Sequence, residues 1–410
     1  MNRILDRCAG LDVHQATVMA TVRIPDEAGD RRGITQEFAT TTVGLLTLRD
    51  WLQAHGVTHV AMESTGVYWK PVYYVLEDAF SLLLVNAQHV KRVPGRKTDV
   101  TDSEWVAQLL ECGLLQGSFV PPQPIRDLRD LTRYRKQQIG DRTREVNRLH
   151  KVLEDAGVKL SSVATDVMGV SGRAMLDGLL HGTTDAAVLA ELAKGKLRRK
   201  LPALRAALQG RFRAHHALLV GQILGKVDFL DEVITTLTEE IDRLVAPFEP
   251  MLANLDTIPG VDRKGAIAIV AETGGDMSRF QSPERLCSWS AICPGQHESA
   301  GKRRSGKTRK GNRYLRTALI ESGLAAGRAK NTALQACYRR VMRNRGHKKA
   351  VVATGHQILR IAFHIMRDGV PYHELGAAYL DQRQRERAIR RHVQHLEKLG
   401  YQVLLVQPAA

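Results

Sequence analysis

The sequence predicts an α/β domain at the N-terminus, followed by a long helical hairpin and a mainly α-helical C-terminal domain. Two observations carry this prediction. The first 120 residues alternate short extended patterns with helical ones, whereas the segments 126–160 and 211–247 keep a helical pattern throughout. Successive prolines in "VPPQP" (120–124) separate these two regions, because proline interrupts both helices and sheets.

The N-terminal region carries the signals of an ordered series of strands and helices. The stretch "AGLDVHQATVMATVRI" alternates apolar and polar residues as the two strands of a hairpin do, and "ITQEF" predicts a third strand. The elements predicted next are a helix at 42–56, a strand at 57–63, a helix at 68–80, a strand at 81–87 and a helix at 99–113. Three antiparallel strands followed by this alternation is the element order of a ribonuclease-H-like domain.

The two long helical segments are expected to pack against each other as an antiparallel coiled coil. The second carries a heptad seam, formed by Leu219, Ile223, Val227, Leu230, Ile234, Leu237, Ile241 and Leu244. The first carries a row of cations, namely Arg129, Arg133, Arg135, Lys136, Arg142, Arg144 and Arg148. The sequence leaves open whether these cations contact phosphate or face solvent. Between these two segments, the pattern of residues 161–210 predicts short helices that cap the hairpin.

The C-terminal domain begins near "LDTIPGVDRKGAIAIVAETGG" (255–275), which is similar to a helix-hairpin-helix element. Such an element presents backbone amides to a phosphate without reading base sequence. Asp262 stands where a second glycine is usual, so a purely structural turn is equally compatible. The predicted domains are therefore 1–120, the helical region 121–250, the C-terminal domain 251–369 and a tail, 370–410, to which the sequence assigns no function.

Charge is distributed unevenly along the chain, whose total is +17. Residues 1–120 contain 11 Lys and Arg against 14 Asp and Glu, whereas residues 251–369 contain 22 against 8. A polyanion such as nucleic acid is therefore expected at the C-terminal part. No apolar run approaches the roughly 18 residues of a membrane span, and the five cysteines are never spaced as C-x-x-C. We expect reduced thiols, a cytoplasmic location and no membrane partner.

Four carboxylates are candidates for a metal site. Asp12 lies within a predicted strand and Glu63 ends another, where a carboxylate is costly unless it is paired or bound to metal. Asp99 and Asp102, in "GRKTDVTD" (95–102), are three residues apart at the start of a helix and share one face. Oxygen ligands of this kind suit Mg²⁺. Taken alone, the last two acids could equally cap the helix.

Basic residues accompany two of these features. Arg96 and Lys97 precede Asp99, next to the expected position of a scissile phosphate. Residues 302–316 contain eight Lys and Arg and no acid, interleaved with Gly, Ser and Asn, which predicts a flexible phosphate-binding loop that leads into a helix near Asn312. The predicted nucleic-acid-binding residues of this loop are Lys302, Arg303, Arg304, Lys307, Arg309, Lys310 and Arg313. The adjacent pair His215 and His216 is expected to be structural.

Five motifs in order resemble one known family. They are "GLDV", "ESTGVYW", "GRKTDVTD", "TIPGV" and "ESAGKRRSGKTRKGNRYLR". Together they resemble the DEDD transposases of the insertion-sequence one-ten family, also described as bridge-RNA-guided serine recombinases. The resemblance covers roughly 8–115 and 250–369.

The resemblance implies a transposase with two catalytic parts. It makes Asp12, Glu63, Asp99 and Asp102 the metal-binding acids, and Ser299 of "ESAG" the nucleophile that forms a covalent phosphoserine link with DNA. It also implies a homo-oligomer, a dimer or tetramer, in which the acids of one protomer complete the serine site of another. A structured noncoding RNA that pairs with donor and target DNA would choose the sequence.

Departures from the family pattern keep alternatives open. Family members often have Ser-Gly where this chain has Ser299-Ala300, so Ser305 is the fallback nucleophile. A lysine that commonly follows the first acid is absent. One alternative function is a metal-dependent nuclease that hydrolyses DNA junctions without a serine nucleophile. Another is a nucleic-acid-binding protein whose acids are structural.

Overall fold

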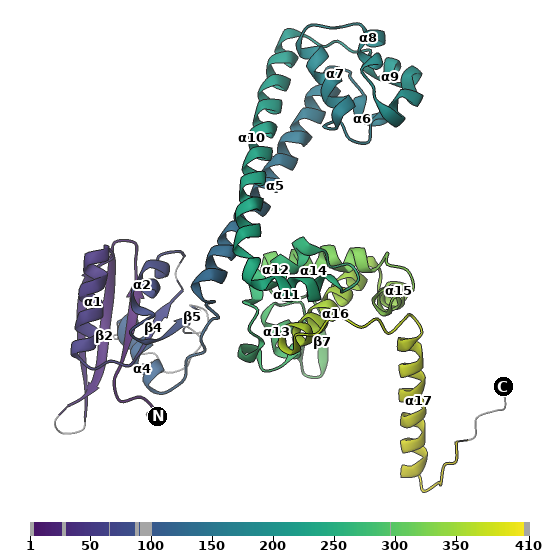
Figure 1. The fold of residues 1–410 in the computed structure, drawn as a ribbon. Helices are drawn as coiled ribbons and strands as arrows, with labels where there is room; N and C mark the ends of the chain where they lie inside the picture. The colour runs from purple at the N-terminus through teal and green to yellow at the C-terminus, as the bar shows by residue number, and fades with distance from the viewer. Residues whose placement is uncertain are drawn as a thin grey trace. The chain divides into compact units, whose positions relative to one another are not determined.

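The computed structural model describes residues 4–26, 30–64, 66–86, 90, 101–295 and 297–405, without the side chains of residues 297, 299, 303, 304, 380, 381, 383 and 384. The chain divides into two compact units, residues 1–120 and 121–410. Figure 1 shows both units and labels many of their elements.

The N-terminal unit is built on a mixed five-stranded sheet in the order β3-β2-β1-β4-β5. Its strands are β1 (Cys8–Val13), β2 (Thr17–Pro25), β3 (Arg31–Ala39), β4 (His59–Glu63) and β5 (Ser81–Val85). The first three pair antiparallel, while β4 lies parallel to both β1 and β5. The α/β N-terminal domain predicted from the sequence, with three antiparallel strands first, is thus confirmed.

Helices cover both faces of this sheet. On one face, α1 (Thr42–Ala54) and α2 (Trp69–Leu76) bury apolar side chains against Ala9, Leu11 and Val13 of β1. On the other face, α4 (Asp102–Glu111) packs its Trp105 and Leu109 against Cys8 and Ala61. Because side chains alternate along a strand, the odd and even positions of β1 belong to different layers. The even positions, which include Asp12, face α4.

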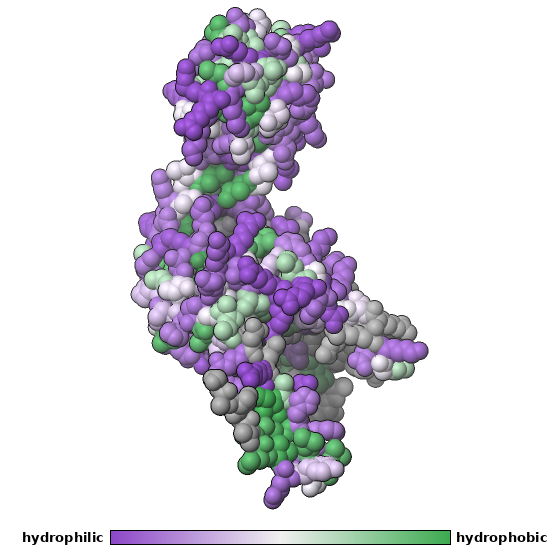
Figure 2. Space-filling view, turned by 90° about the vertical axis from the view of Figure 1, so that its right-hand side faces the viewer, coloured by the Kyte–Doolittle hydropathy of each residue, from purple (hydrophilic) through white to green (hydrophobic). Residues whose placement is uncertain are grey.

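The second unit begins with a pair of long helices, α5 (Gln123–Asp155) and α10 (Ala214–Leu244), which lie side by side (Figure 1). Their contacts fix an antiparallel register. Near the middle, Arg142 Nε lies 2.5 Å from Asp231 Oδ1, and one turn on, Lys226 Nζ lies 2.6 Å from Glu145 Oε1. Figure 2 shows this pair and its cap, at the top, covered mainly by hydrophilic residues.

The tip of the helix pair carries a cap of short helices with its own apolar core. The cap helices are α6 (Leu160–Val163), α7 (Val170–Leu180), α8 (Ala186–Glu191), η1 (Gly195–Lys200) and α9 (Leu201–Leu208). This core displaces the predicted heptad seam at the start of α10. Val220 and Leu224 are buried against the cap, whereas Leu219 remains 47% exposed. From Val227 onward the seam follows α5, and Val227, Leu230 and Ile241 are buried.

The cations of α5 hold the unit together, so neither of the two alternatives left open by the sequence describes them fully. Each has a partner within the unit. The partners are Glu272 for Arg129 and Arg133, Thr238 for Arg135, Glu321 for Lys136, Asp231 for Arg142, Asp141 for Arg144 and Glu145 for Arg148. Much of the positive charge of α5 is therefore neutralised internally.

The remainder of the chain is mainly helical, as predicted, with one small β-hairpin. Its elements are η2 (Ala246–Phe248), α11 (Glu249–Asp256), α12 (Arg263–Thr273), η3 (Met277–Phe280), α13 (Pro283–Trp289), β6 (His297–Ser299), β7 (Lys302–Ser305), α14 (Arg313–Ala326), α15 (Ala333–Arg345), α16 (His347–Asp368) and α17 (Tyr379–Lys398). Within the part of the chain that the structure describes, we find no helix with the length and apolar character of a membrane span.

A buried carboxylate joins α5, α12 and α14. Glu272 on α12 is 1% exposed, and Arg133 of α5 donates two hydrogen bonds to its oxygens, at 2.8 and 2.7 Å. Asn312, which precedes α14, donates a third bond to Oε2 at 2.6 Å. Arg129 donates to the backbone oxygens of Ala271 and Glu272. A buried charge is stable only when it is paired in this way.

Replacing Glu272 should destabilise this unit far more than replacing an exposed glutamate. We expect Glu272→Ala to lower the free energy of unfolding by about 3–5 kcal/mol, because it leaves two partly buried cations and the Asn312 amide without their partner. The matched control is Glu321→Ala, which removes an exposed ion pair with Lys136 and should cost less than about 1 kcal/mol. Urea unfolding followed by circular dichroism measures both. Equal effects would contradict the role assigned to Glu272.

Candidate functional site

Three predicted acids of the N-terminal unit lie on one face of its sheet. Asp12 is the fifth residue of β1, and Glu63 ends the parallel neighbour β4. The register pairs Leu11 with Met62, so Asp12 and Glu63 follow at the same edge. Both share the α4 side of the sheet, because Asp12 is two positions beyond Gly10 and Glu63 two beyond Ala61. Asp102 is the first residue of α4, the helix on that side.

Close packing brings the start of α4 to β1. Gly10 lies so near α4 that a Cβ atom there would collide with the backbone of Ser103 and Ala107. Ser103 is fully buried, and its hydroxyl lies 2.8 Å from Thr21 Oγ1 on β2. Asp102 therefore starts its helix beside the strand that carries Asp12. The cap of α4 is Thr101, whose hydroxyl accepts from the Glu104 amide, so capping does not fall to Asp102.

His14 is a neighbour of Asp12 that the sequence did not single out. Its Nε2 lies 3.2 Å from Asp12 Oδ2, and the Asp12 side chain is 22% exposed while that of His14 is 64% exposed. The two residues are separated by one position across the end of β1, which places them on the same face. This i, i+2 spacing is the signal that could have revealed His14.

The donor set on this face has the chemistry that suits a hard divalent cation, although its ligand atoms do not all lie within 4.8 Å of one another. Carboxylate oxygens from Asp12, Glu63 and Asp102 are the ligands that Mg²⁺ prefers, and they come from secondary-structure elements fixed by packing. The remaining predicted acid, Asp99, and the predicted phosphate contacts Arg96 and Lys97 lie outside the described residues.

The predicted serine lies on a β-hairpin within the basic segment. Ser299 is the last residue of β6 and pairs with Lys302, the first residue of β7. The two residues between them both have positive φ, 50° for Ala300 and 71° for Gly301, as in a tight two-residue hairpin turn. The flexible loop expected at 302–305 is therefore a strand. The side chains of Ser299, Arg303 and Arg304 lie outside the described part.

Ala300 occupies a conformation that favours glycine. An alanine in the left-handed region is strained by roughly 1 kcal/mol relative to glycine. The position at which the resemblance places Ser-Gly is thus one where the backbone itself calls for glycine, and Gly301 satisfies only the second half of the turn.

The C-terminal end of the basic loop is anchored by three residues. Gly311 fits only without a side chain, because a Cβ there would collide with Ala291, at the end of the preceding helix. Arg309 donates to Ser288 Oγ at 3.0 Å. Asn312 accepts from the amides of Tyr314 and Leu315, which starts α14 at the predicted position. Lys302 and Lys307 precede these anchors, Lys310 lies among them, and all three are exposed and so accessible to a phosphate.

Tyr314 lies between two arginines at the exit of this loop. The guanidinium carbons of Arg133 and Arg313 are 4.8 and 4.7 Å from its ring centre. Its hydroxyl accepts from Arg313 at 2.8 Å and from Gln137 at 3.2 Å. Burial alone would raise the pKa of Tyr314, but these hydrogen bonds and charges outweigh it and lower the pKa. Arg313 therefore has a structural contact as well as its predicted nucleic-acid role.

In the turn that resembles a helix-hairpin-helix element, the side chain of Asp262 already bonds to a backbone amide. The carboxylate of Asp262 accepts from the Gly265 amide at 2.8 Å and caps α12. Gly260, with φ of 89°, lies against the backbone of α14. An amide that would meet a phosphate is thus already bonded, which favours the structural interpretation of this turn.

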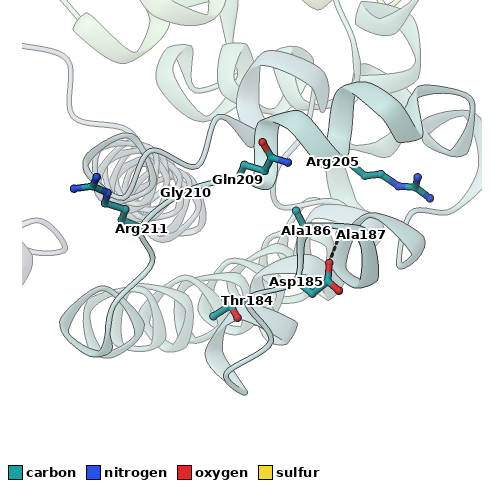
Figure 3. A pocket seen from close by; sticks show the side chains of 8 residues that line it. All are labelled: Thr184, Asp185, Ala186, Ala187, Arg205, Gln209, Gly210 and Arg211. Atoms are coloured by element: carbon teal, nitrogen blue, oxygen red, sulfur yellow. Dashed lines mark hydrogen bonds between the residues drawn. The ribbon is translucent and has the colours of Figure 1, made fainter.

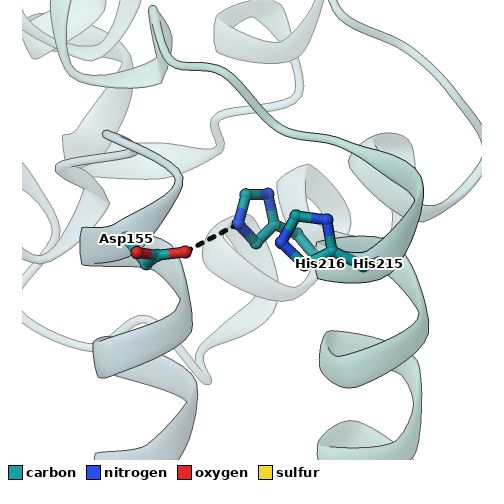
Figure 4. Close-up of side chains that lie close together, drawn as sticks. All are labelled: Asp155, His215 and His216. Carbon is teal, nitrogen blue, oxygen red and sulfur yellow. Dashed lines mark hydrogen bonds and ion pairs between the residues drawn. The ribbon is translucent and has the colours of Figure 1, made fainter.

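A separate cluster joins the ends of α5 and α10 (Figure 4). Among the described residues, Asp155, His215 and His216 form the group whose potential metal-ligating atoms all lie within 4.8 Å of one another. His216 Nδ1 accepts from the Arg213 amide, so Nε2 carries the proton that is donated to Asp155, 2.9 Å away. These hydrogen bonds tie the end of α5 to the start of α10, so we call the cluster a clamp, and they support the structural role expected for His215 and His216.

An open cavity of about 550 Å³ lies in the cap (Figure 3). Asp185 beside it caps α8 through the Ala187 amide. Arg205 and Arg211 extend in opposite directions, and Arg205 pairs with Glu191. The polar groups do not converge on one point, so we assign no chemistry to this cavity.

Comparison with known proteins identifies the class. A DEDD transposase model matches residues 9–157, the part that carries the strand-edge acids. A second model, described as "Transposase IS116/IS110/IS902 family", matches residues 252–339, which include Ser299 and the basic loop. The chain is therefore a transposase. It belongs to the IS110 family, in agreement with the resemblance seen in its motifs.

Two curated relatives support this assignment. An uncharacterised 42 kDa protein of insertion element IS900 from Mycobacterium paratuberculosis is 26% identical over 331 residues, which are 72% of this chain and 80% of that protein. A putative transposase, y4qE, from Sinorhizobium fredii is 25% identical over 248 residues, 58% of this chain and 51% of that protein. The chain thus spans about half the length of the second relative.

Zinc should not stabilise the clamp at Asp155. We expect Zn²⁺ to leave the thermal unfolding temperature unchanged, and His216→Ala to lower it, because removing a buried hydrogen-bonded group costs about 1–3 kcal/mol. The exposed neighbour provides the control, since His215→Ala should have little effect. A rise in unfolding temperature with Zn²⁺ that His215→Ala abolishes would contradict the structural role.

Glycine at position 300 should tighten the serine hairpin. Ala300→Gly removes a strain of about 1 kcal/mol, which corresponds to about five-fold slower local opening. Hydrogen exchange of the peptide covering 297–305, followed by mass spectrometry, measures this change. An alanine with negative φ serves as the control, and Ala378→Gly should speed exchange near α17. Faster exchange in Ala300→Gly would contradict the assigned turn.

Proposed function

We propose that this transposase cuts and rejoins insertion-element and target DNA through a covalent phosphoserine link and strand exchange. The observation that carries the proposal is the shared face of Asp12, Glu63 and Asp102, at the edge of β1 and β4 and at the start of α4. Carboxylate oxygens on one face of a sheet are the kind of ligand that a divalent cation requires. The order of the strands supports a ribonuclease-H-like domain.

The acids would hold Mg²⁺. Asp12, Glu63, Asp99 and Asp102 supply oxygen ligands, and the bound cation would offset negative charge on the phosphodiester oxygens. His14, 3.2 Å from Asp12, would orient that carboxylate. Arg96, Lys97 and the loop cations Lys302, Arg303, Arg304, Lys307, Arg309, Lys310 and Arg313 would bind the DNA backbone.

Ser299 would form the covalent link. Its hydroxyl oxygen attacks the phosphorus of a DNA phosphodiester, a new phosphorus–oxygen bond forms, and the bond to one deoxyribose oxygen breaks. The serine proton passes to a nearby base, and the leaving deoxyribose oxygen takes up a proton. One ester replaces another, so rejoining to a different strand needs no external energy source. A tight hairpin would hold Ser299 in place for this step.

The working assembly would contain several copies of the chain. The acids of one protomer would complete the serine site of another, in a dimer or tetramer joined in part through the helix pair as a coiled coil. Exposed apolar side chains on α10, Leu218, Leu219 and Phe229, support contacts there. An element-encoded RNA that pairs with donor and target DNA would select the sequence.

Removing the Ser299 hydroxyl should abolish strand exchange. We expect Ser299→Ala to lower recombination of element DNA by about 10³-fold or more, and to eliminate a covalent protein–DNA species on denaturing gels. The matched control, Ser305→Ala, should retain both, because Ser305 lies at the far end of β7.

The same assay distinguishes the proposed recombinase from the alternative, a junction nuclease without a serine nucleophile. If Ser299→Ala still cleaves DNA and the unchanged protein yields no covalent species, the chain is a junction nuclease that works through the acids alone. If Ser305→Ala loses the covalent species instead, the nucleophile is Ser305 and the assignment of Ser299 is wrong.

A further inference from the structure

Positive charge gathers at the turn between α15 and α16, outside every segment that the proposed function uses. Residues 339–349 contain six Lys and Arg and no acid. Five of them, Arg339, Arg343, Arg345, Lys348 and Lys349, have exposed side chains, and we call these five the turn surface. The family model ends at residue 339, where the turn surface begins.

The charges of the turn surface differ from those of α5. Each cation in the row on α5 has a partner within the unit, whereas no ion pair joins the turn surface to a carboxylate among the residues that the structure describes. Unpaired cations of one sign, close together, repel one another and lower stability. Their positions therefore need a cause other than folding.

Helix dipoles account for only part of the turn surface. Arg343 and Arg345 lie in the last turn of α15, where cations are favourable. Lys348 and Lys349 lie in the first turn of α16, where a cation meets the positive end of the helix. Arg339 and Arg343 are four residues apart on one helix, a repulsive spacing. A bound polyanion would offset both unfavourable effects, at the start of α16 and between Arg339 and Arg343.

The surroundings of the turn surface indicate contacts with phosphates and not with bases. The aromatic ring nearest in sequence, Tyr338, is held by His347, whose Nδ1 lies 2.6 Å from the tyrosine hydroxyl. It also packs against Gly327. Single-stranded nucleic acid is usually bound by free aromatic rings that stack on bases. The turn surface offers cations alone, which suits the backbone of a duplex.

The last helix, α17, carries further positive charge. Helix α17 packs against α15 and carries four exposed arginines, Arg385, Arg387, Arg390 and Arg391, again without an ion pair among the described residues. Its twenty residues extend about 30 Å. An extended series of cations can follow several phosphates along a duplex.

We propose that the turn surface, continued by α17, binds the phosphate backbone of double-stranded DNA without reading its sequence. The inference takes DNA as the polyanion from the proposed function, but it concerns residues that take no part in strand chemistry. It assigns a role to the C-terminal tail, for which the sequence indicates none.

The test is the salt dependence of binding to a 30-base-pair duplex that lacks element ends, followed by fluorescence anisotropy. The variant replaces Arg343, Arg345, Lys348 and Lys349 by Gln. Each lost phosphate contact lowers the slope of log affinity against log salt by about 0.9, so we expect a fall of about 3 to 4 and at least ten-fold weaker binding.

The matched control removes the same charge from the cap, by replacing Lys194, Lys196, Arg199 and Arg211 with Gln. It should change affinity by less than about two-fold. A second variant, Arg387, Arg390 and Arg391 to Gln, alters only the exposed α17 and should lower the slope by about 2 to 3. Circular dichroism verifies that each variant is folded.

Several results would overturn the inference. If the turn variant loses no more affinity than the cap control, the turn surface does not bind DNA. If the loss appears for a structured RNA and not for duplex DNA, the partner is RNA. Binding is measured without strand cleavage, so failure of the serine chemistry leaves this test unaffected.

Discussion

The helical unit depends on the pairing of one buried carboxylate. Glu272 is 1% exposed, so its charge is stable only where cations and donors surround it. Arg133 comes from the long helix α5, and Asn312 comes from the end of the basic loop. The same residue thus fixes the base of the helix pair and the exit of the loop that carries the predicted DNA contacts. Asn312 then starts α14 through its own side-chain oxygen.

In the N-terminal unit the comparable constraint is the close packing of α4 on β1, which requires a glycine at position 10. Because Gly10 has no side chain, the backbone of α4 packs directly against the backbone of β1. The buried Ser103 hydroxyl then forms a hydrogen bond with Thr21 of the next strand. The approach sets Asp102 on the face that Asp12 and Glu63 share. Packing therefore places the three carboxylates on one face of the sheet, where a bound cation would offset their negative charge. The family of this chain agrees with such a site.

The sequence predicts the elements well because periodicity is local. The strands β1 to β5, the helices α5 and α10 and the start of α14 follow from spacing, prolines and a capping asparagine. Features that depend on distant partners could not be predicted. The cations of α5 find acids up to 185 positions away, as Lys136 does with Glu321. The seam of α10 shifts near Leu219 because the cap supplies a second core there. The tight turn at Ala300 could not be predicted, because alanine rarely adopts a positive φ and so gives no sequence signal for such a turn.

Identification of the residue that bonds to DNA tests the central claim most directly. The covalent species formed with element DNA would be digested with protease and nuclease, and the peptide that retains a nucleotide would be sequenced by mass spectrometry. The account predicts a nucleotide phosphate on Ser299, formed only when the strand-edge acids are intact. A nucleotide on Ser305 or Tyr314, or a cleaved strand with no nucleotide on any peptide, would contradict it.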